Sequence, residues 1–305
     1  MKKAAAQPIG QLKPFVVTAS HDAVLQAVYR YQLLTCVQLL KALSYSQNSL
    51  AGMQRLVKKL TDNGYLLAIA HPVTRGKPPL VYTLARKGLN YLYAQEFDVK
   101  EYFRPSKEQE KSYLFLQHTL SLNDILIAAS QIHKYTSDYS LSSFTHERIL
   151  KKTPYKVKVW RGEKLEWVTL IPDAYMLFVK HKKKEDKTIP TLWELDRNTV
   201  EQKHFRRNFR ARIEFIKEEG YKSLLGTPTV TFAYAVAQGG VKRRNEILAW
   251  QRKELAATKE KRWLANLFLV CALQKDIDAK RLFLEPCWYT PFEDKKPVSI
   301  FDKIL

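Results

Sequence analysis

Cysteine is scarce in this sequence, and the few cysteines form no pattern. The 305 residues include three, Cys36, Cys271 and Cys287, an odd number spread far apart. A disulfide framework needs cysteines in pairs, and zinc sites commonly use closely spaced Cys-x-x-Cys ligands. The sequence therefore argues against both classes, and we expect a protein of the reducing cytoplasm.

Long apolar runs are also missing. Nowhere do about 18 uncharged apolar residues follow one another, the length that a membrane-spanning helix needs, and the first residues lack the apolar run of a signal peptide. No glycine-rich phosphate loop occurs, which argues against nucleotide hydrolysis. We expect a soluble protein without a membrane partner.

Acidic residues are few beside basic ones. The chain has 30 Asp and Glu against 51 Lys and Arg, a formal net charge of +21. Such an excess predicts a polyanionic partner, nucleic acid first, although a solubilising surface or an acidic protein partner would also account for it. An apolar content of 46% supplies enough material for two packed cores.

Three helices are expected in the first domain. Asp22 is predicted to cap the first helix, the second begins after Thr35, and the third follows the capping residues 46–49 and stops at Asn63-Gly64. Apolar residues recur at helical spacing in each, so each helix buries one face. This is the pattern of a helix-turn-helix, whose last helix reads DNA.

The exposed side of the third helix is predicted to contact duplex DNA. Amides can read adenine edges, and cations can reach guanine or phosphate. Residues 65–70 and 80–84 are predicted strands around a basic tip, a wing that touches phosphate or the minor groove. The predicted contacts are Gln47, Asn48, Gln54, Arg55, Lys58 and Lys59 on the helix side, called the recognition face below, and Arg75 and Lys77 on the wing. A winged helix that only docks proteins is the alternative.

A second domain follows a polar linker. The predicted organisation is an N-terminal extension over 1–20, a winged-helix domain over 21–97, a linker over 98–112 and an α/β domain over 113–305. In this last domain we expect a helix over 113–133, strands over 143–150, 157–159, 167–170, 174–180 and 191–195, an amphipathic helix around Phe205 to Ile216, and then strand, helix and strand to residue 273.

Carboxylates follow or end several of the predicted strands. Glu147, Asp173, Glu194 and Asp196 are expected near one edge of the sheet, where carboxylate oxygens could hold Mg²⁺ or Mn²⁺ beside a phosphate. Asp173 followed by Glu-x-Asp on a later apolar strand echoes the PD-(D/E)xK arrangement of restriction-endonuclease-like folds. The alternative for each acid is an ion pair with a neighbouring cation, namely Arg148, Lys151 or Arg197.

Two further groups of residues invite a chemical interpretation. His118 and Asp124 lie about 240° apart around one predicted helix, so a surface or capping role is expected for them in place of acid–base chemistry. Trp250, Trp263 and Trp288 could stack on bases, but core packing is the expected role.

Several motifs together resemble a known family. The text LVKKLTDNGYLLAIAHPVTRGKPPLVYTLARKGLNYL is similar to the winged-helix domains of bacterial transcription regulators. The segments LQHTLSLNDILIA, HERIL, IPDAYML and WELDRNTVE, with Trp-Tyr-Thr-Pro near the C-terminus, resemble the replication-relaxation family of bacterial plasmids and mobile elements. The resemblance implies a winged-helix front, a nuclease-like rear and a link to plasmid replication and DNA relaxation.

The sequence differs from the motif of an active nuclease at one position. Asp196 stands where the PD-(D/E)xK motif has its lysine, and Arg197 or Lys203 would have to replace that lysine.

We therefore expect a double-stranded DNA-binding protein of a plasmid or mobile element, acting in DNA replication, relaxation or its transcriptional control. One alternative is a metal-dependent endonuclease or nickase with Glu147, Asp173, Glu194, Asp196 and Lys203 as catalytic residues and Mg²⁺ or Mn²⁺ on Asp173 and Glu194. Another alternative is an interaction platform for a relaxase, transposition or replication protein. A homodimer is compatible with each.

Overall fold

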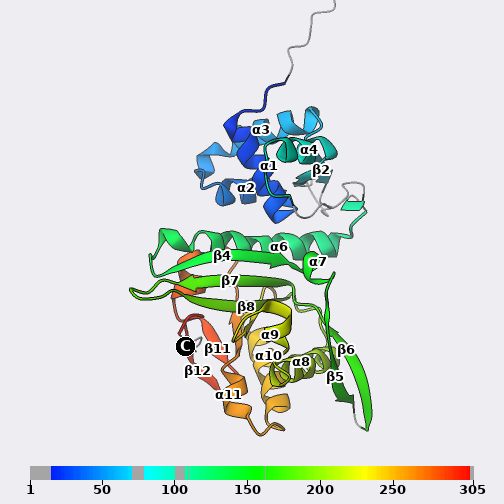
Figure 1. Cartoon of the computed structure of the whole chain (residues 1–305), viewed down its shortest axis with the longest axis vertical. Coiled ribbons are helices and arrows are strands. Elements are labelled where there is room, and N and C mark those ends of the chain that lie inside the picture. The colour runs from blue at the N-terminus through cyan, green and yellow to red at the C-terminus, as the bar shows by residue number, and fades with distance from the viewer. Residues whose placement is uncertain (1–14, 71–78, 100–106, 109, 162, 303–305) are drawn as a thin grey trace, which may run out of the picture. The chain divides into compact units, whose positions relative to one another are not determined.

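The chain folds into two compact units of mixed helices and strands. The structure, a computed structural model, describes residues 15–70, 79–99, 107–108, 110–161 and 163–302. Its contacts divide the chain into residues 1–111 and 112–305 (Figure 1). The predicted mixture of α and β structure is confirmed. No helix in the described ranges combines the length and apolar character needed to cross a membrane.

The first unit packs helices against a small sheet. Its strands have the order β1-β3-β2, and β2 pairs antiparallel with β3 from Leu66↔Leu84 to Ala70↔Leu80. Each helix turns one apolar face inward, as the 3–4 spacing predicted. The elements are α1 (Ala19–Tyr31), β1 (Leu34–Thr35), α2 (Cys36–Ala42), the 3-10 turn η1 (Gln47–Ser49), α3 (Leu50–Asp62), β2 (Leu66–Ala70), β3 (Leu80–Leu84) and α4 (Arg86–Ala94).

The first residues of α1 and α2 test two predictions, of which one is wrong and one is confirmed. The predicted cap Asp22 is wrong, because α1 begins at Ala19 with Thr18 as its cap, four residues before Asp22. The Asp22 N–H already donates to the Thr18 carbonyl at 2.9 Å. The Thr18 N–H donates to His21 Nδ1 at 3.2 Å. Thr35 caps α2 as predicted, accepting a hydrogen bond from the Gln38 N–H at 3.2 Å.

The second unit is built on a seven-stranded mixed sheet with the order β12-β11-β10-β9-β8-β7-β4. Strands β4, β7 and β8 run antiparallel, whereas β8, β9 and β10 run parallel. The parallel strands are joined through helices because a parallel connection needs a crossover. The elements up to the sheet centre are α6 (Tyr113–Ser130), η2 (Ile132–Lys134), β4 (Tyr139–His146), α7 (Glu147–Leu150), β5 (Tyr155–Arg161), β6 (Lys164–Leu170), β7 (Ala174–Lys180) and β8 (Lys187–Asp196).

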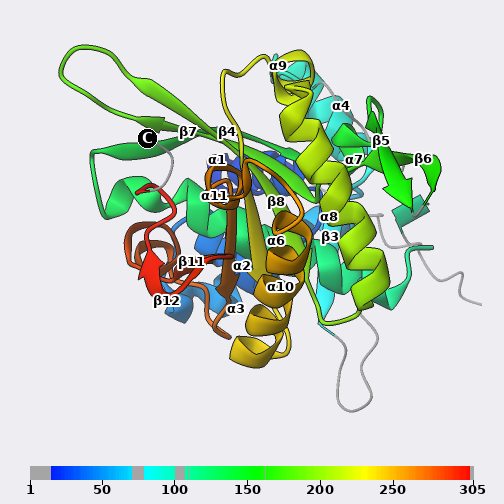
Figure 2. The same ribbon diagram turned by 90° about the horizontal axis from the view of Figure 1, so that it is seen from below.

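Helices cover both sides of this sheet. In Figures 1 and 2, α6 runs along β4 on one side, while α8 and α10 lie side by side on the other. Strands β5 and β6 form a separate two-stranded hairpin beside α8. The remaining elements are α8 (Gln202–Lys217), α9 (Gly220–Leu225), β9 (Thr231–Val236), α10 (Gly240–Leu255), α11 (Lys261–Ala265), β10 (Phe268–Ala272), η3 (Lys280–Leu284), β11 (Trp288–Thr290) and β12 (Glu293–Val298).

The two faces of strand β8 pack against different groups of buried residues. Leu192 belongs to the core cluster that includes Phe209 of α8 and Phe232 of β9. Trp193 points to the opposite face, where its ring lies 5.4 Å from that of Trp288 between centroids. Because side chains alternate along a strand, Glu194 and Asp196 share the face of Leu192.

The predicted strand over residues 143–150 is wrong in its second half. Strand β4 ends at His146, and Glu147 opens the short helix α7. The backbone explains the change, since the Glu147 N–H donates to the Asp173 carbonyl and the Lys151 N–H donates to the Glu147 carbonyl, both at 2.8 Å. The second bond closes a helical turn in place of a further strand pairing.

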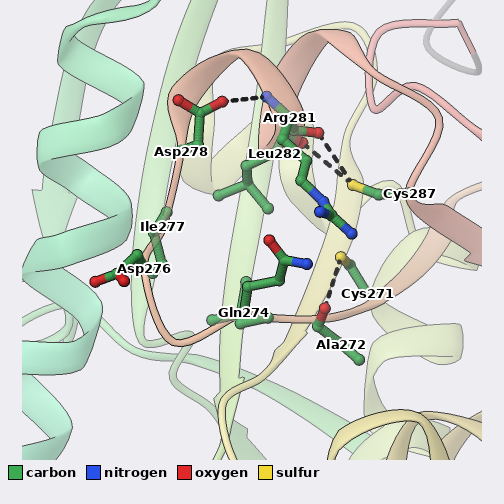
Figure 3. Close-up of a pocket in the computed structure, with 10 residues that line it drawn as sticks. Cys271, Ala272, Gln274, Asp276, Ile277, Asp278, Arg281, Leu282 and Cys287 are labelled. Atoms are coloured by element: carbon green, nitrogen blue, oxygen red, sulfur yellow. Dashed lines mark hydrogen bonds between the residues drawn. The ribbon is translucent and has the colours of Figure 1, made fainter.

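A small pocket lies between β10 and η3. Cys271 and Cys287 line it, and all three cysteines of the chain are free thiols (Figure 3). The Cys271 thiol donates to the Ala272 carbonyl at 3.5 Å, and the Cys287 thiol donates to the Arg281 carbonyl at 3.4 Å. The Cys287 thiol therefore contacts η3, whereas the contact of the Cys271 thiol stays within β10.

Gly88 predicts a stability difference that can be measured. A Cβ at this position of α4 would lie 2.3 Å from the Tyr65 carbonyl oxygen, so we expect Gly88→Ala to destabilise the first unit by about 1–3 kcal/mol. A Cβ added at Gly52 in α3 would meet no atom within 4 Å, and Gly52→Ala should stabilise by about 1 kcal/mol. Urea denaturation of both variants checks this, and equal midpoints would contradict the close approach of α4 to Tyr65.

Candidate functional site

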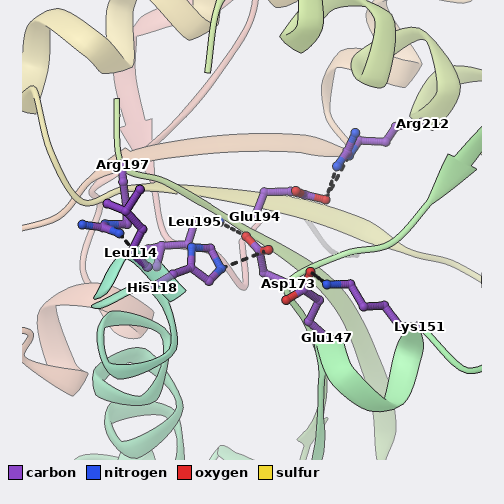
Figure 4. A network of polar contacts seen from close by, with 9 residues as sticks. All are labelled: Leu114, His118, Glu147, Lys151, Asp173, Glu194, Leu195, Arg197 and Arg212. Carbon is purple, nitrogen blue, oxygen red and sulfur yellow. Dashed lines mark hydrogen bonds and ion pairs between the residues drawn. The ribbon is translucent and has the colours of Figure 1, made fainter. Parts of the chain in front are cut away.

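The carboxylate of Asp173 joins three elements of the second unit. Asp173 directly precedes β7, and its N–H donates to the Trp193 carbonyl at 2.9 Å. One carboxylate oxygen, Oδ2, accepts the Leu195 N–H at 2.6 Å, and the other, Oδ1, lies 3.1 Å from His118 Nε2 (Figure 4). Both oxygens of Asp173 are therefore held in place, one by strand β8 and one by helix α6.

His118 reaches Asp173 because Arg197 holds helix α6 against the end of β8. The Arg197 guanidinium donates to the Leu114 carbonyl at 3.0 Å and to the Gln117 side-chain oxygen. Burial lowers the pKa of His118, but the hydrogen bond to Asp173 and the nearby negative charges outweigh it and raise that pKa above its usual value. The expected surface or capping role for His118 is wrong, since its side chain is only 25% exposed and contacts Asp173.

Glu147 completes a three-residue cluster. One ligand atom each from His118, Glu147 and Asp173 lies within 4.8 Å of the other two. Glu147 also pairs with Lys151, whose ammonium is 2.5 Å from Oε1, as the ion-pair alternative for this acid proposed. An imidazole nitrogen and two carboxylates form a donor set that fits a divalent cation such as Mn²⁺, with room for solvent because all three residues are partly exposed.

The structure does not gather the four predicted acids into one cluster. Glu194 and Asp196 lie on the face of β8 toward α8 and α10, where Arg212 and Arg243 contact them. Glu194 Oε1 accepts from Arg212 Nε at 3.0 Å (Figure 4), and burial raises the pKa of Glu194 to about 7 against the opposing charge of Arg212. Asp173 therefore clusters with Glu147 and His118, while Glu194 is held by Arg212 although the charge of Asp173 also acts on it, and the metal pair of Asp173 and Glu194 stays a prediction.

Asp196 forms a buried two-point ion pair. Arg243 Nε lies 2.9 Å from Asp196 Oδ1 and Arg243 Nη2 lies 3.0 Å from Oδ2, with both side chains 6% exposed. Asp196 Oδ1 also accepts the Asn198 N–H at 2.8 Å. The residue in the lysine position of the motif thus connects β8 to α10. Lys203, predicted as a replacement for that lysine, is exposed in the first turn of α8.

The recognition face has the exposure that the sequence predicted. Met53, Val57 and Leu60 of α3 are buried, and all six residues of the recognition face are exposed. Lys58 pairs with Asp62 at 2.6 Å, both of them exposed, while the Arg55 Nε donates to the Ala51 carbonyl. The predicted wing residues Arg75 and Lys77 lie outside the described residues.

The tryptophans differ from expectation in part. Trp288 is fully buried and Trp250 packs against the core, as expected, but Trp263 is 54% exposed. Trp160 and Trp167, which the sequence interpretation did not single out, are 62% and 61% exposed. The alternation Lys-Val-Lys-Val-Trp over 156–160 was the available signal, because period-two alternation sends the valines inward and the other side chains outward.

The comparisons with known proteins identify one family. A family model described as replication-relaxation matches residues 25–227, well over half of the chain. No curated protein matches. A solved structure of a MarR cysteine-to-serine mutant from E. coli, complexed with operator DNA, matches with 20% identity over 39% of this chain and 75% of that chain, with a TM-score of 0.24.

The Asp196–Arg243 pair predicts a structural role for Asp196. Asp196→Asn removes the buried counter-charge of the Arg243 guanidinium and leaves it only the more exposed Glu246 at 3.3 Å, so we expect a loss of about 3–5 kcal/mol in the free energy of unfolding. Asp276→Asn, at an exposed acid of the same unit, is the matched control and should change stability little. Urea denaturation distinguishes the two, and equal stability of the Asp196 and Asp276 variants would contradict the structural role.

Proposed function

The chain belongs to the replication-relaxation family, and on that premise we propose that it is a double-stranded DNA-binding protein of a plasmid or mobile element. Its role is in DNA replication or relaxation, or in the transcriptional control of these processes. The observation that carries the proposal is the recognition face. Gln54, Arg55, Lys58 and Lys59 are exposed on the side of α3 opposite its buried residues, and Gln47 and Asn48 are exposed in the turn η1 that precedes α3.

The chemistry of the recognition face suits a duplex. Gln54 and Asn48 offer amides that can pair with adenine, and Arg55 and Lys59 offer cations for guanine or phosphate. The net charge of +21 adds a general attraction to the phosphate backbone. Lys58 is the weaker candidate for a base contact, because it already pairs with Asp62.

We propose that the first unit is a winged helix. The order of α1, α2 and α3 followed by the antiparallel pair β2–β3 supports this, with α3 as the helix that enters the major groove. The segment between β2 and β3 carries Arg75 and Lys77, and these residues are proposed as wing contacts from the sequence alone.

Two substitutions on α3 test this assignment. Arg55→Ala and Lys59→Ala should each weaken the binding of full-length protein to duplex DNA of its own element by about tenfold, because each removes one cation from the groove or backbone. Arg30→Ala, at an exposed arginine of α1, removes the same charge off the recognition face and should have a smaller effect. Fluorescence anisotropy at low salt measures the three affinities, and three equal losses would favour general charge attraction over recognition by α3.

The second unit supports a further candidate function, a metal-dependent DNA nuclease or nickase. The observation in its favour is the cluster of His118, Glu147 and Asp173. Asp173 directly precedes β7, and Glu194 lies on the neighbouring strand β8, as in a nuclease-like motif. A divalent cation bound by the cluster would supply Lewis-acid stabilisation of a phosphate and activation of a bound water. Without that chemistry, the unit is proposed to add DNA contact or dimerisation.

A nuclease of this kind needs a positively charged side chain beside the metal ligands. The Asp196 carboxylate occupies the lysine position and binds Arg243. Arg197 donates to α6, although its positive charge is close enough to act on His118. Lys151 pairs with Glu147, so its ammonium lies beside one of the three ligands. The candidate nuclease therefore depends on the metal and on Lys151, with Lys203 in an exposed position.

Metal titration tests the cluster. We expect Mn²⁺ to bind the wild-type chain in calorimetry, and Asp173→Asn or His118→Ala to weaken it at least about tenfold, because each removes a ligand. Asp186→Asn is the matched control, since His181 and Asp186 form a second His–Asp pair at 3.0 Å on an exposed loop. Plasmid nicking with Mn²⁺ or Mg²⁺ that disappears in Asp173→Asn supports the nuclease. Wild-type Mn²⁺ affinity in that variant would remove the site.

A further inference from the structure

The hairpin of β5 and β6 presents two chemically different faces. Alternation along both strands sends Val157, Val159, Val168 and Leu170 inward, where each is at most 4% exposed and belongs to the core cluster beneath α8. The opposite face, called the outer face of the hairpin, is formed by six exposed residues: Lys156, Lys158, Trp160, Leu165, Trp167 and Thr169.

The outer face cannot fold back onto the core, because the hairpin is fixed to α8 from its inner side. Arg207 Nε lies 2.7 Å from Glu166 Oε1, and Arg210 donates to the Trp160 carbonyl at 3.0 Å. The Tyr155 ring packs edge-on against Phe215, with 4.9 Å between centroids. Two large aromatic side chains are therefore held in solvent by a rigid support, on the hairpin that stands apart from the main sheet in Figures 1 and 2.

Aromatic rings and cations are interleaved on this face. Lys158 lies directly across from Trp167 in the strand register, with its ammonium 5.0 Å from the ring centroid, and Trp160 lies across from Leu165. The two tryptophans are diagonal neighbours, about 7–8 Å apart along the hairpin. None of the six residues is acidic, so the face combines stacking surfaces with positive charge only.

We propose that the outer face of the hairpin binds unpaired DNA, with bases stacking on Trp160 and Trp167 and phosphates attracted to Lys156 and Lys158. Proteins that bind single strands combine exposed aromatic side chains with cations that follow the backbone. Duplex DNA does not fit the tryptophans equally well, because its base faces are covered by neighbouring bases. The proposal rests on the proposed function, since it adds the binding of unpaired DNA by the second unit to the binding of duplex DNA.

Self-association through this face is disfavoured by charge. A twofold interface would bring the same patch of two copies together, so that the lysines of one copy face lysines or their neighbours on the other. Like charges across an interface are costly, whereas a polyanion neutralises them. Charge complementarity therefore selects a nucleic-acid strand over a second copy of the chain.

The test compares unpaired and duplex DNA on the full chain. We expect Trp160→Ala and Trp167→Ala each to weaken the binding of a labelled oligothymidylate of about 16 nucleotides by about tenfold, and Trp160→Phe to retain most of it. Trp263→Ala is the matched control, because this tryptophan is 54% exposed on α11 and lies outside the hairpin. Duplex affinity should be unchanged in all four variants.

The outcomes separate this inference from the proposed function. Wild-type oligothymidylate affinity in both alanine variants, or an equal loss in Trp263→Ala, overturns the role of the outer face. Duplex binding without any oligothymidylate binding by the wild type overturns the inference and leaves the proposed function standing, whereas absence of both overturns both. Loss of a dimer in sedimentation, with oligothymidylate binding unchanged, would make the face a self-association surface instead.

Discussion

The carboxylate of Asp173 is the constraint on which the arrangement of the second unit's site depends. One of its oxygens accepts the Leu195 N–H and the other contacts His118, so strands β7 and β8 and helix α6 meet at one side chain. Its own carbonyl accepts the Glu147 N–H, which ends β4 and starts α7. A carboxylate held by a backbone N–H and an imidazole keeps a fixed orientation, and the cluster with Glu147 follows from it.

The acids at and near β8 make different contacts. Glu194 and Asp196 face α8 and α10, where buried arginines neutralise them, and such pairs are expensive to break although they add little net stability. They fix the register of the crossover helices on the sheet. Asp173 lies at the strand end, where α6 brings His118, and only there do partly exposed ligands come together among the described residues. The same apolar strand therefore supports both a structural ion-pair network and a candidate metal site.

How much could be predicted from the sequence depended on how local each feature is. The exposed stripe of α3 follows from helical spacing within a few turns, and the valines of the β5–β6 hairpin follow from alternation. His118 and Asp173 are far apart in the chain, and no local pattern reports that Arg197 will hold α6 over the end of β8. The helical turn at Glu147 is likewise decided by a hydrogen bond to Asp173, not by the residues of HERIL themselves.

We propose that this member of the replication-relaxation family binds duplex DNA through a cationic surface that includes α3. The most direct measurement is the affinity of the full chain for duplex DNA over a series of salt concentrations. We expect tight binding at low salt and a linear fall of log K with log salt, with a slope of about −0.9 for each phosphate contacted. No affinity at low salt, or affinity that does not change with salt, would contradict it.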